Sequence, residues 1–156
     1  MNKDLKIATF NVQSLVNKVH EVNYFLSSNK LDILCLNETF LNENTNHINL
    51  LKNFTITRND RPTRGGGVAF IIKNNISFKI LEKKSTADYE LLVISLENNA
   101  LTIVNVYTHP KSNTNYKFLE KIASKYKNLI TVGDFNATNT NWFCPSSNKG
   151  DNPWKT

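Results

Sequence analysis

The sequence has few of the residues on which small secreted proteins and metal-cluster proteins depend. Its 156 residues include only two cysteines, five glycines and four prolines. Two cysteines cannot build a disulfide framework or a cysteine-based metal cluster, and Cys35 stands inside an apolar run, as a core residue would. No apolar run approaches the ~20 residues of a membrane span, and the first residues lack the hydrophobic region of a signal peptide. These absences predict a soluble intracellular protein, cytoplasmic or nuclear and not secreted, with no membrane partner.

What is present fits one globular domain with a basic surface. Residues 1–156 are enough for a single domain with its own core, and the 40% hydrophobic and 21% charged content is ordinary. A net charge of +6 suits a polyanionic partner such as nucleic acid. The chain also holds 25 asparagines, and lysine far outnumbers arginine, as an AT-rich coding sequence would give. The net charge alone therefore does not decide between a nucleic-acid partner and the composition of an AT-rich gene.

Hydrophobic periodicity predicts helices that alternate with strands at both ends of the chain and hairpins between them. Helical spacing of apolar residues covers Ser14–Ser28 and Tyr116–Tyr126, and Asn46–Lys52 is a candidate short helix. Asn74-Asn75 and Asn98-Asn99 are candidate hairpin tips. The predicted strands are Leu5–Val12, Leu31–Leu36, Phe54–Arg58, Val68–Lys73, Ser77–Leu81, Glu90–Leu96, Leu101–Tyr107 and Leu129–Gly133. This order indicates a mixed α/β fold (α+β) with helices packed on sheet.

Polar side chains follow four of these strands at the point where each strand ends. Asn11 closes the first strand, and Glu38 follows the second. Tyr107 closes the VNVY strand, and the last strand runs into Asp134 and Asn136 of the sequence GDFN. Ligands of α/β sheets bind at strand ends where loops converge. The pattern therefore predicts one polar crater without a cysteine or serine nucleophile.

These residue types suit the hydrolysis of a phosphoester by water. Carboxylate and carboxamide oxygens are the ligands of hard divalent cations, and Glu38 with Asn11 or Asp134 could supply them. Asp134 could align the attacking water, while Asn136 and Tyr107 could donate hydrogen bonds to the charge on the phosphate. Each residue alone also fits a turn, a helix start or a packing role, so the joint pattern carries the prediction. His109 is interpreted as a surface or loop residue.

Five segments in order carry a resemblance to a known family. The segments are FNVQSL, LNETFL, RNDRPTRGGGVAF, VNVYTHP and GDFNATNTNW. Together they resemble the endonuclease/exonuclease/phosphatase superfamily, and more narrowly the endonuclease domain of non-LTR (LINE-type, jockey-like) retrotransposons. The resemblance implies a four-layer αββα sandwich of the deoxyribonuclease I-like type. It also implies Mg²⁺- or Mn²⁺-dependent nicking of DNA at a target site, with a reverse transcriptase domain as a partner in the full element.

The resemblance also assigns roles to single residues. By match to the family's motifs, Asn11 and Glu38 belong to the metal site, and Tyr107 contacts the scissile phosphate. Asp134 orients the nucleophile, and Asn136 stabilises the transition state. These assignments make Tyr107, Asp134 and Asn136 catalytic.

Two departures from the family pattern bear on activity. Asn139, a candidate substrate-binding residue with Tyr107 and Asn136, stands where the family has a histidine, and asparagine cannot carry a proton near neutral pH. The family's terminal Asp-His pair is absent from the sequence. The resemblance therefore implies a domain that is incomplete at its C-terminus, lacks its last strands, and is weakly active or inactive. The alternatives are a non-catalytic remnant or nucleic-acid-binding module of a mobile element, and a small-molecule or lipid phosphoesterase of the same superfamily.

Overall fold

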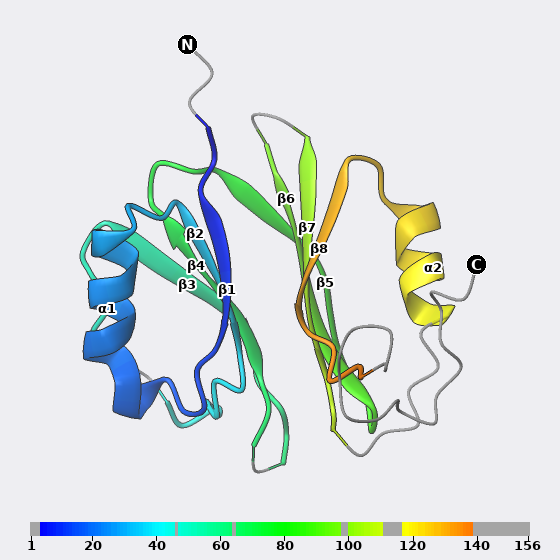
Figure 1. Cartoon of the computed structure of the whole chain (residues 1–156), viewed down its shortest axis with the longest axis horizontal. Helices are drawn as coiled ribbons and strands as arrows, with labels where there is room; N and C mark the ends of the chain where they lie inside the picture. Colours follow the sequence, from blue (N-terminus) through cyan, green and yellow to red (C-terminus); the bar gives the residue numbers. More distant parts are fainter. Residues whose placement is uncertain (1–3, 46, 64, 98–99, 111–116, 139–156) are drawn as a thin grey trace.

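The computed structural model describes residues 4–45, 47–63, 65–97, 100–110 and 117–138. These residues form two four-stranded sheets with one α-helix against each (Figure 1). The elements are β1 (Ile7–Asn11), a 3₁₀ turn (Val16–Lys18), α1 (Val19–Ser28), β2 (Ile33–Asn37), β3 (Phe54–Asn59), β4 (Val68–Lys73), β5 (Phe78–Ser85), β6 (Tyr89–Leu96), β7 (Leu101–Thr108), α2 (Lys117–Lys125) and β8 (Leu129–Asp134).

The two sheets have related topologies. The first has the order β1-β2-β4-β3, with β1 parallel to β2 and the other neighbours antiparallel. The second has the order β5-β6-β7-β8, with β7 parallel to β8. In each parallel pair the connection runs through a helix, α1 or α2, because a crossover between parallel strands needs a long segment. The predicted β6–β7 hairpin is confirmed, with Leu96 opposite Leu101.

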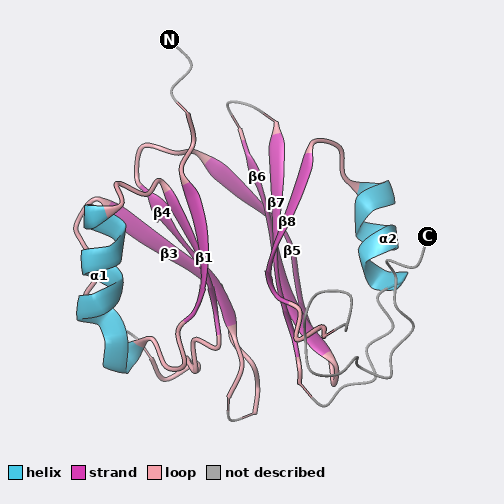
Figure 2. Cartoon of the chain, in the orientation of Figure 1, coloured by secondary structure: helices cyan, strands magenta, loops and turns pink. Residues whose placement is uncertain are grey.

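Alternating side chains of the strands build three apolar layers of core. In β2, Leu34 and Leu36 pack toward α1, while Ile33 and Cys35 face the space between the sheets. A third cluster joins the outer face of the second sheet to α2 through Ile122. The result is helix, sheet, sheet, helix (Figure 2). The predicted four-layer sandwich is therefore confirmed, and it follows from the period of two in each strand.

The predicted helix over Asn46–Lys52 is wrong for the described residues 47–52, which are irregular. The side chain of Asn23 on α1 takes over the backbone hydrogen bonds of this segment. Its Nδ2 donates to the Asn49 carbonyl at 3.0 Å, and its Oδ1 accepts the Leu51 N–H at 3.2 Å. Tertiary hydrogen bonds thus replace the helical ones.

The predicted hairpin around Asn74-Asn75 is also wrong, although both strands exist. β4 lies between β2 and β3, so both of its edges are occupied. The chain therefore crosses to the second sheet, where β5 pairs with β6. Which strands pair is a tertiary choice that the local turn signal does not encode.

Candidate active site

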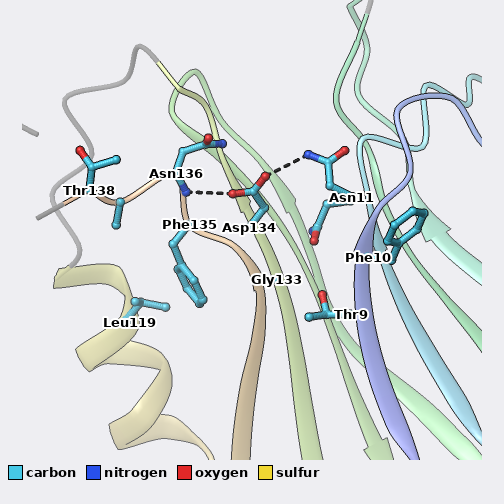
Figure 3. Close-up of a pocket in the computed structure, with 11 residues that line it drawn as sticks. Thr9, Phe10, Asn11, Leu119, Gly133, Asp134, Phe135, Asn136 and Thr138 are labelled. Atoms are coloured by element: carbon cyan, nitrogen blue, oxygen red, sulfur yellow. Dashed lines mark hydrogen bonds between the residues drawn. The ribbon is translucent and has the colours of Figure 1, made fainter. Parts of the chain in front are cut away.

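The predicted site residues lie together at one end of the sandwich. Asn11 ends β1, Glu38 directly follows β2, and Asp134 ends β8. Tyr107 on β7 is the register partner of Asp134. Figure 3 shows Asn11 and Asp134 facing each other from the two different sheets, with Asn136 beside Asp134. Strand ends that are distant in sequence thus meet at one rim.

Two side chains, Asn11 and Tyr107, link the two sheets across this rim. Asn11 Nδ2 donates to Glu38 Oε1 and to Asp134 Oδ2, both at 2.9 Å. The Tyr107 hydroxyl donates to the same Glu38 Oε1 at 2.9 Å. The Asn11 amide therefore bonds both carboxylates, and the Tyr107 phenol bonds Glu38.

The backbone at the rim is held in an uncommon conformation. Glu38 has a φ of 53° and Asn136 a φ of 44°, both in the left-handed region. Asparagine adopts this region more readily than glutamate does, because its side chain bonds local backbone groups. The Asn136 N–H donates to Asp134 Oδ1 at 3.0 Å, and Asn136 Nδ2 donates to the Thr108 carbonyl at 2.7 Å. Left-handed non-glycine residues gather at functional sites, where the surrounding contacts hold them.

Tyr107 is held in its neutral, proton-donating form. Burial raises the pKa of its phenol first, followed by its hydrogen bond to Glu38 and the negative charges of Glu38, Asp134 and Glu90. The side chain is therefore a hydrogen-bond donor over the whole neutral range, and it is not a nucleophile.

A buried asparagine pair behind the rim was not anticipated from the sequence. Asn37 Nδ2 donates to Asn105 Oδ1 at 3.0 Å and to the Val106 carbonyl at 3.1 Å. Asn105 Nδ2 donates to the carbonyls of Leu36 and Ala69 at 2.9 and 3.0 Å. The pair fastens the two sheets together one residue before Glu38. The available signal was an asparagine inside each of two apolar strands, where a polar side chain needs a partner.

A second unanticipated group is centred on Glu90, whose side chain is fully buried at the start of β6. Its Oε2 accepts the Gly67 N–H at 2.7 Å. Its Oε1 lies 2.8 Å from His109 Nε2 and 3.5 Å from Arg61 Nε. His109 lies in the predicted loop, directly after β7, but its side chain is only 11% exposed and its ring lies 5.5 Å from that of Tyr107. A single acidic residue at the start of a strand gives no sequence signal that it will be buried and bind a loop, a histidine and an arginine.

Glycines connect this group to the rim. Gly67, with a φ of 89°, accepts the Thr39 N–H, and Gly66 accepts the Phe40 N–H at 2.9 Å. A Cβ at Gly67 would lie 2.4 Å from Thr39 Oγ1, and one at Gly66 would lie 2.8 Å from both Glu90 carboxylate oxygens. The predicted GGG loop, Gly65–Gly67, thus fixes the backbone directly after Glu38, and we call it the glycine strap.

The rim opens into a cleft of about 790 Å³ between β1 and β8. Asn11, Asp134 and Asn136 line it, together with Phe10 and Phe135. Asn11 Oδ1 is buried and accepts no hydrogen bond from a described residue. Among the described residues no three histidine, cysteine or acidic side chains converge on one point. A hard cation needs few protein ligands if it keeps several waters, so an orphaned amide oxygen beside a carboxylate fits Mg²⁺ or Mn²⁺.

The Endonuclease/Exonuclease/phosphatase family model matches residues 8–155. The chain belongs to this family. Its sequence is 28% identical over 151 residues to a probable RNA-directed DNA polymerase from transposon X-element of Drosophila melanogaster, a match that covers 93% of this chain and 16% of that protein. The family assignment and the likeness to a transposon protein agree with the sequence motifs.

Solved structures of the endonuclease/exonuclease/phosphatase type share the fold. The endonuclease domain of TRAS1, a telomere-specific non-LTR retrotransposon, superposes with a TM-score of 0.67 at 16% identity, covering 94% of this chain and 65% of that one. An AP endonuclease from Archaeoglobus fulgidus superposes with a TM-score of 0.63 at 22% identity, covering 86% and 58%. The chain thus spans about 58% to 65% of these two structures.

Within the described residues, no helix combines the length and apolarity needed to cross a membrane. Asn139 lies outside the described residues.

Proposed function

We propose that this chain is a retrotransposon-type endonuclease domain that nicks DNA weakly by metal-dependent hydrolysis of a phosphodiester. The observation that carries the proposal is the Asn11 amide, which joins Glu38 and Asp134 at 2.9 Å each across the two sheets. The family assignment, the basic charge of +6 and the transposon relative support DNA as the substrate.

In this proposal Glu38 and Asn11 hold a Mg²⁺ or Mn²⁺ ion. Asn11 Oδ1 and Glu38 Oε2 are the oxygens of this pair that no described residue bonds. When bound, a divalent cation polarises a phosphoryl oxygen and stabilises charge on the leaving oxygen.

The chain's own residues position the water and the phosphate. Asp134, fixed through both carboxylate oxygens, orients a water for attack on phosphorus. The bond from this water to phosphorus forms as the bond from phosphorus to the leaving ester oxygen breaks; the water's proton passes to solvent, and the leaving oxygen takes one up. Tyr107 and Asn136 donate hydrogen bonds to the phosphate oxygens as their charge grows.

Nicking of supercoiled plasmid by the purified chain in Mg²⁺ tests the proposal. The informative variant is Glu38→Gln, which keeps the size and the acceptor oxygen but removes the charge. We expect it to lower the nicking rate at least ~100-fold, since the cation supplies several kcal/mol of charge stabilisation. Glu97→Gln is the matched control, because Glu97 is exposed and pairs with Lys79 away from the site. An EDTA lane should match the Glu38→Gln lane.

Equal nicking by the folded wild type and Glu38→Gln would refute the enzyme proposal. Fluorescence anisotropy with labelled duplex DNA would then test the non-catalytic binding module. Hydrolysis of a phosphoinositide or a sugar phosphate in place of plasmid would instead favour the small-molecule phosphoesterase.

A further inference from the structure

Phe40 is an exposed aromatic residue in a fixed and uncommon conformation. It leaves 41% of its surface exposed, and its φ of 53° lies in the left-handed region. A bulky residue with positive φ is a rare conformation, and one that persists is held by its surroundings. The partly exposed ring in this fixed backbone conformation offers an aromatic surface to a ligand.

The surroundings that hold Phe40 are the glycine strap and the buried acid beneath it. The Phe40 N–H donates to the Gly66 carbonyl at 2.9 Å, and the ring lies against Gly65, where a Cβ would be 3.9 Å from Phe40 Cε1. The strap is fixed in turn by Glu90, which accepts the Gly67 N–H at 2.7 Å. These hydrogen bonds hold the backbone that carries the ring. Little conformational entropy is therefore lost when a flat ligand stacks on the ring.

The ring forms one wall of a second cleft of about 860 Å³. Arg61 lines the same cleft, with 29% of its side chain exposed and its Nε 3.5 Å from Glu90. Two acids, Glu43 and Asp60, also line it, and Asp60 Oδ1 is buried without a hydrogen-bond partner among the described residues. Carboxylate oxygens repel a phosphate but accept hydrogen bonds from the amino groups of bases.

Phe40 connects this second cleft to the candidate active site through the chain. Glu38 and Phe40 are two residues apart, so their Cα atoms are at most ~7 Å from each other. Successive nucleotides of one strand are ~3.4 Å apart along the duplex axis. A base on Phe40 would thus belong to a nucleotide within a few steps of a phosphate held beside Glu38.

We propose that Phe40, with Arg61 beside it in the cleft, is a stacking subsite for a nucleobase close to the scissile phosphate. The subsite rests on the proposed function, since it places a nucleic acid at the rim. It adds a contact to the base, whereas the site residues contact only the phosphate.

The test compares DNA with and without bases. The probes are a fluorescein-labelled single-stranded oligonucleotide and an abasic oligonucleotide of the same length, built from tetrahydrofuran nucleotides. Affinities are measured by anisotropy in EDTA, where no cleavage occurs. Phe40→Ala should weaken binding of the base-containing oligonucleotide by roughly 5- to 100-fold. It should leave binding of the abasic oligonucleotide unchanged.

Three further variants separate stacking from apolar contact and from nonspecific effects of substitution. Phe40→Trp should restore or strengthen binding, and Phe40→Leu should stay weak, because leucine is apolar without a flat face. Tyr24→Ala is the matched control, since Tyr24 is a 75% exposed aromatic on α1 outside both clefts. Circular dichroism verifies that each variant is folded.

The failure of the subsite can be told from the failure of the endonuclease. If the wild type nicks plasmid but folded Phe40→Ala binds both oligonucleotides as the wild type does, the subsite is wrong and the endonuclease stands. Equal losses on both oligonucleotides would also overturn it, because the contact would then be to the backbone. If the wild type binds the base-containing oligonucleotide no better than the abasic one, the subsite fails regardless of nicking.

Discussion

The buried pair Asn37 and Asn105 should be the point at which the two sheets are most sensitive to substitution. Both side chains are at most 1% exposed, and their amides bridge β2, β4 and β7. Asn105→Ala removes three hydrogen bonds, to Asn37, Leu36 and Ala69. Asn37→Ala removes two, to Asn105 and Val106.

The expected losses follow from the number of bonds. A hydrogen bond contributes about 0.5–1.5 kcal/mol net, so Asn105→Ala should lower the free energy of unfolding by about 1.5–4.5 kcal/mol and Asn37→Ala by about 1–3 kcal/mol, before any cavity term. The two single variants share the bond between the asparagines. The double variant should therefore cost less than the sum of the two by one hydrogen bond, about 1 kcal/mol.

Urea unfolding monitored by circular dichroism measures all four proteins of this cycle. Thr102→Ala is a control on the same strand, because Thr102 is also buried and makes no side-chain hydrogen bond to the other sheet within the described part of the chain. A loss below about 0.5 kcal/mol for Asn105→Ala, or strictly additive single variants, would show that the pair does not fasten the sheets.

Two other perturbations test separate features of the fold. Gly67 and Gly65 have nearly equal φ values of 89° and 88°. The Cβ of an alanine at position 67 would lie 2.4 Å from Thr39 Oγ1, whereas one at position 65 would contact only Phe40, at 3.9 Å. Gly67→Ala should therefore be the more destabilising by about 1–3 kcal/mol in urea unfolding, and equal losses would show that the clash is relieved at no cost. Burial raises the pKa of the Cys35 thiol to about 12, so above about pH 9 the folded state keeps a proton that the unfolded state loses, and stability falls as pH rises. Between pH 8 and 10.5 the stability advantage of the wild type over Cys35→Ala should shrink by about 2 kcal/mol, and a constant difference in unfolding free energy would contradict the shielded thiol.

The sequence by itself determined the layers and which strand ends carry the residues of the candidate site. Alternation of apolar residues in strands such as Ile33–Asn37 dictates two buried faces, and the amphipathic segment before it dictates a covering helix. Asn11 and Glu38 fall at one edge of the first sheet because β1 and β2 are parallel, and Tyr107 and Asp134 fall at one edge of the second because β7 and β8 are parallel. These are local patterns, and local patterns can be read along the chain. The roles of these residues in catalysis remain predictions.

Only the tertiary structure decided which groups meet. The pairing of β5 with β6 rather than β4, the link between Asn37 and Asn105, and the burial of Glu90 between Arg61 and His109 all join residues far apart in sequence. Each depends on which of several compatible partners satisfies a buried polar group or a free strand edge. That choice is made by the free energy of the whole packed core, so no single segment of the sequence contains it.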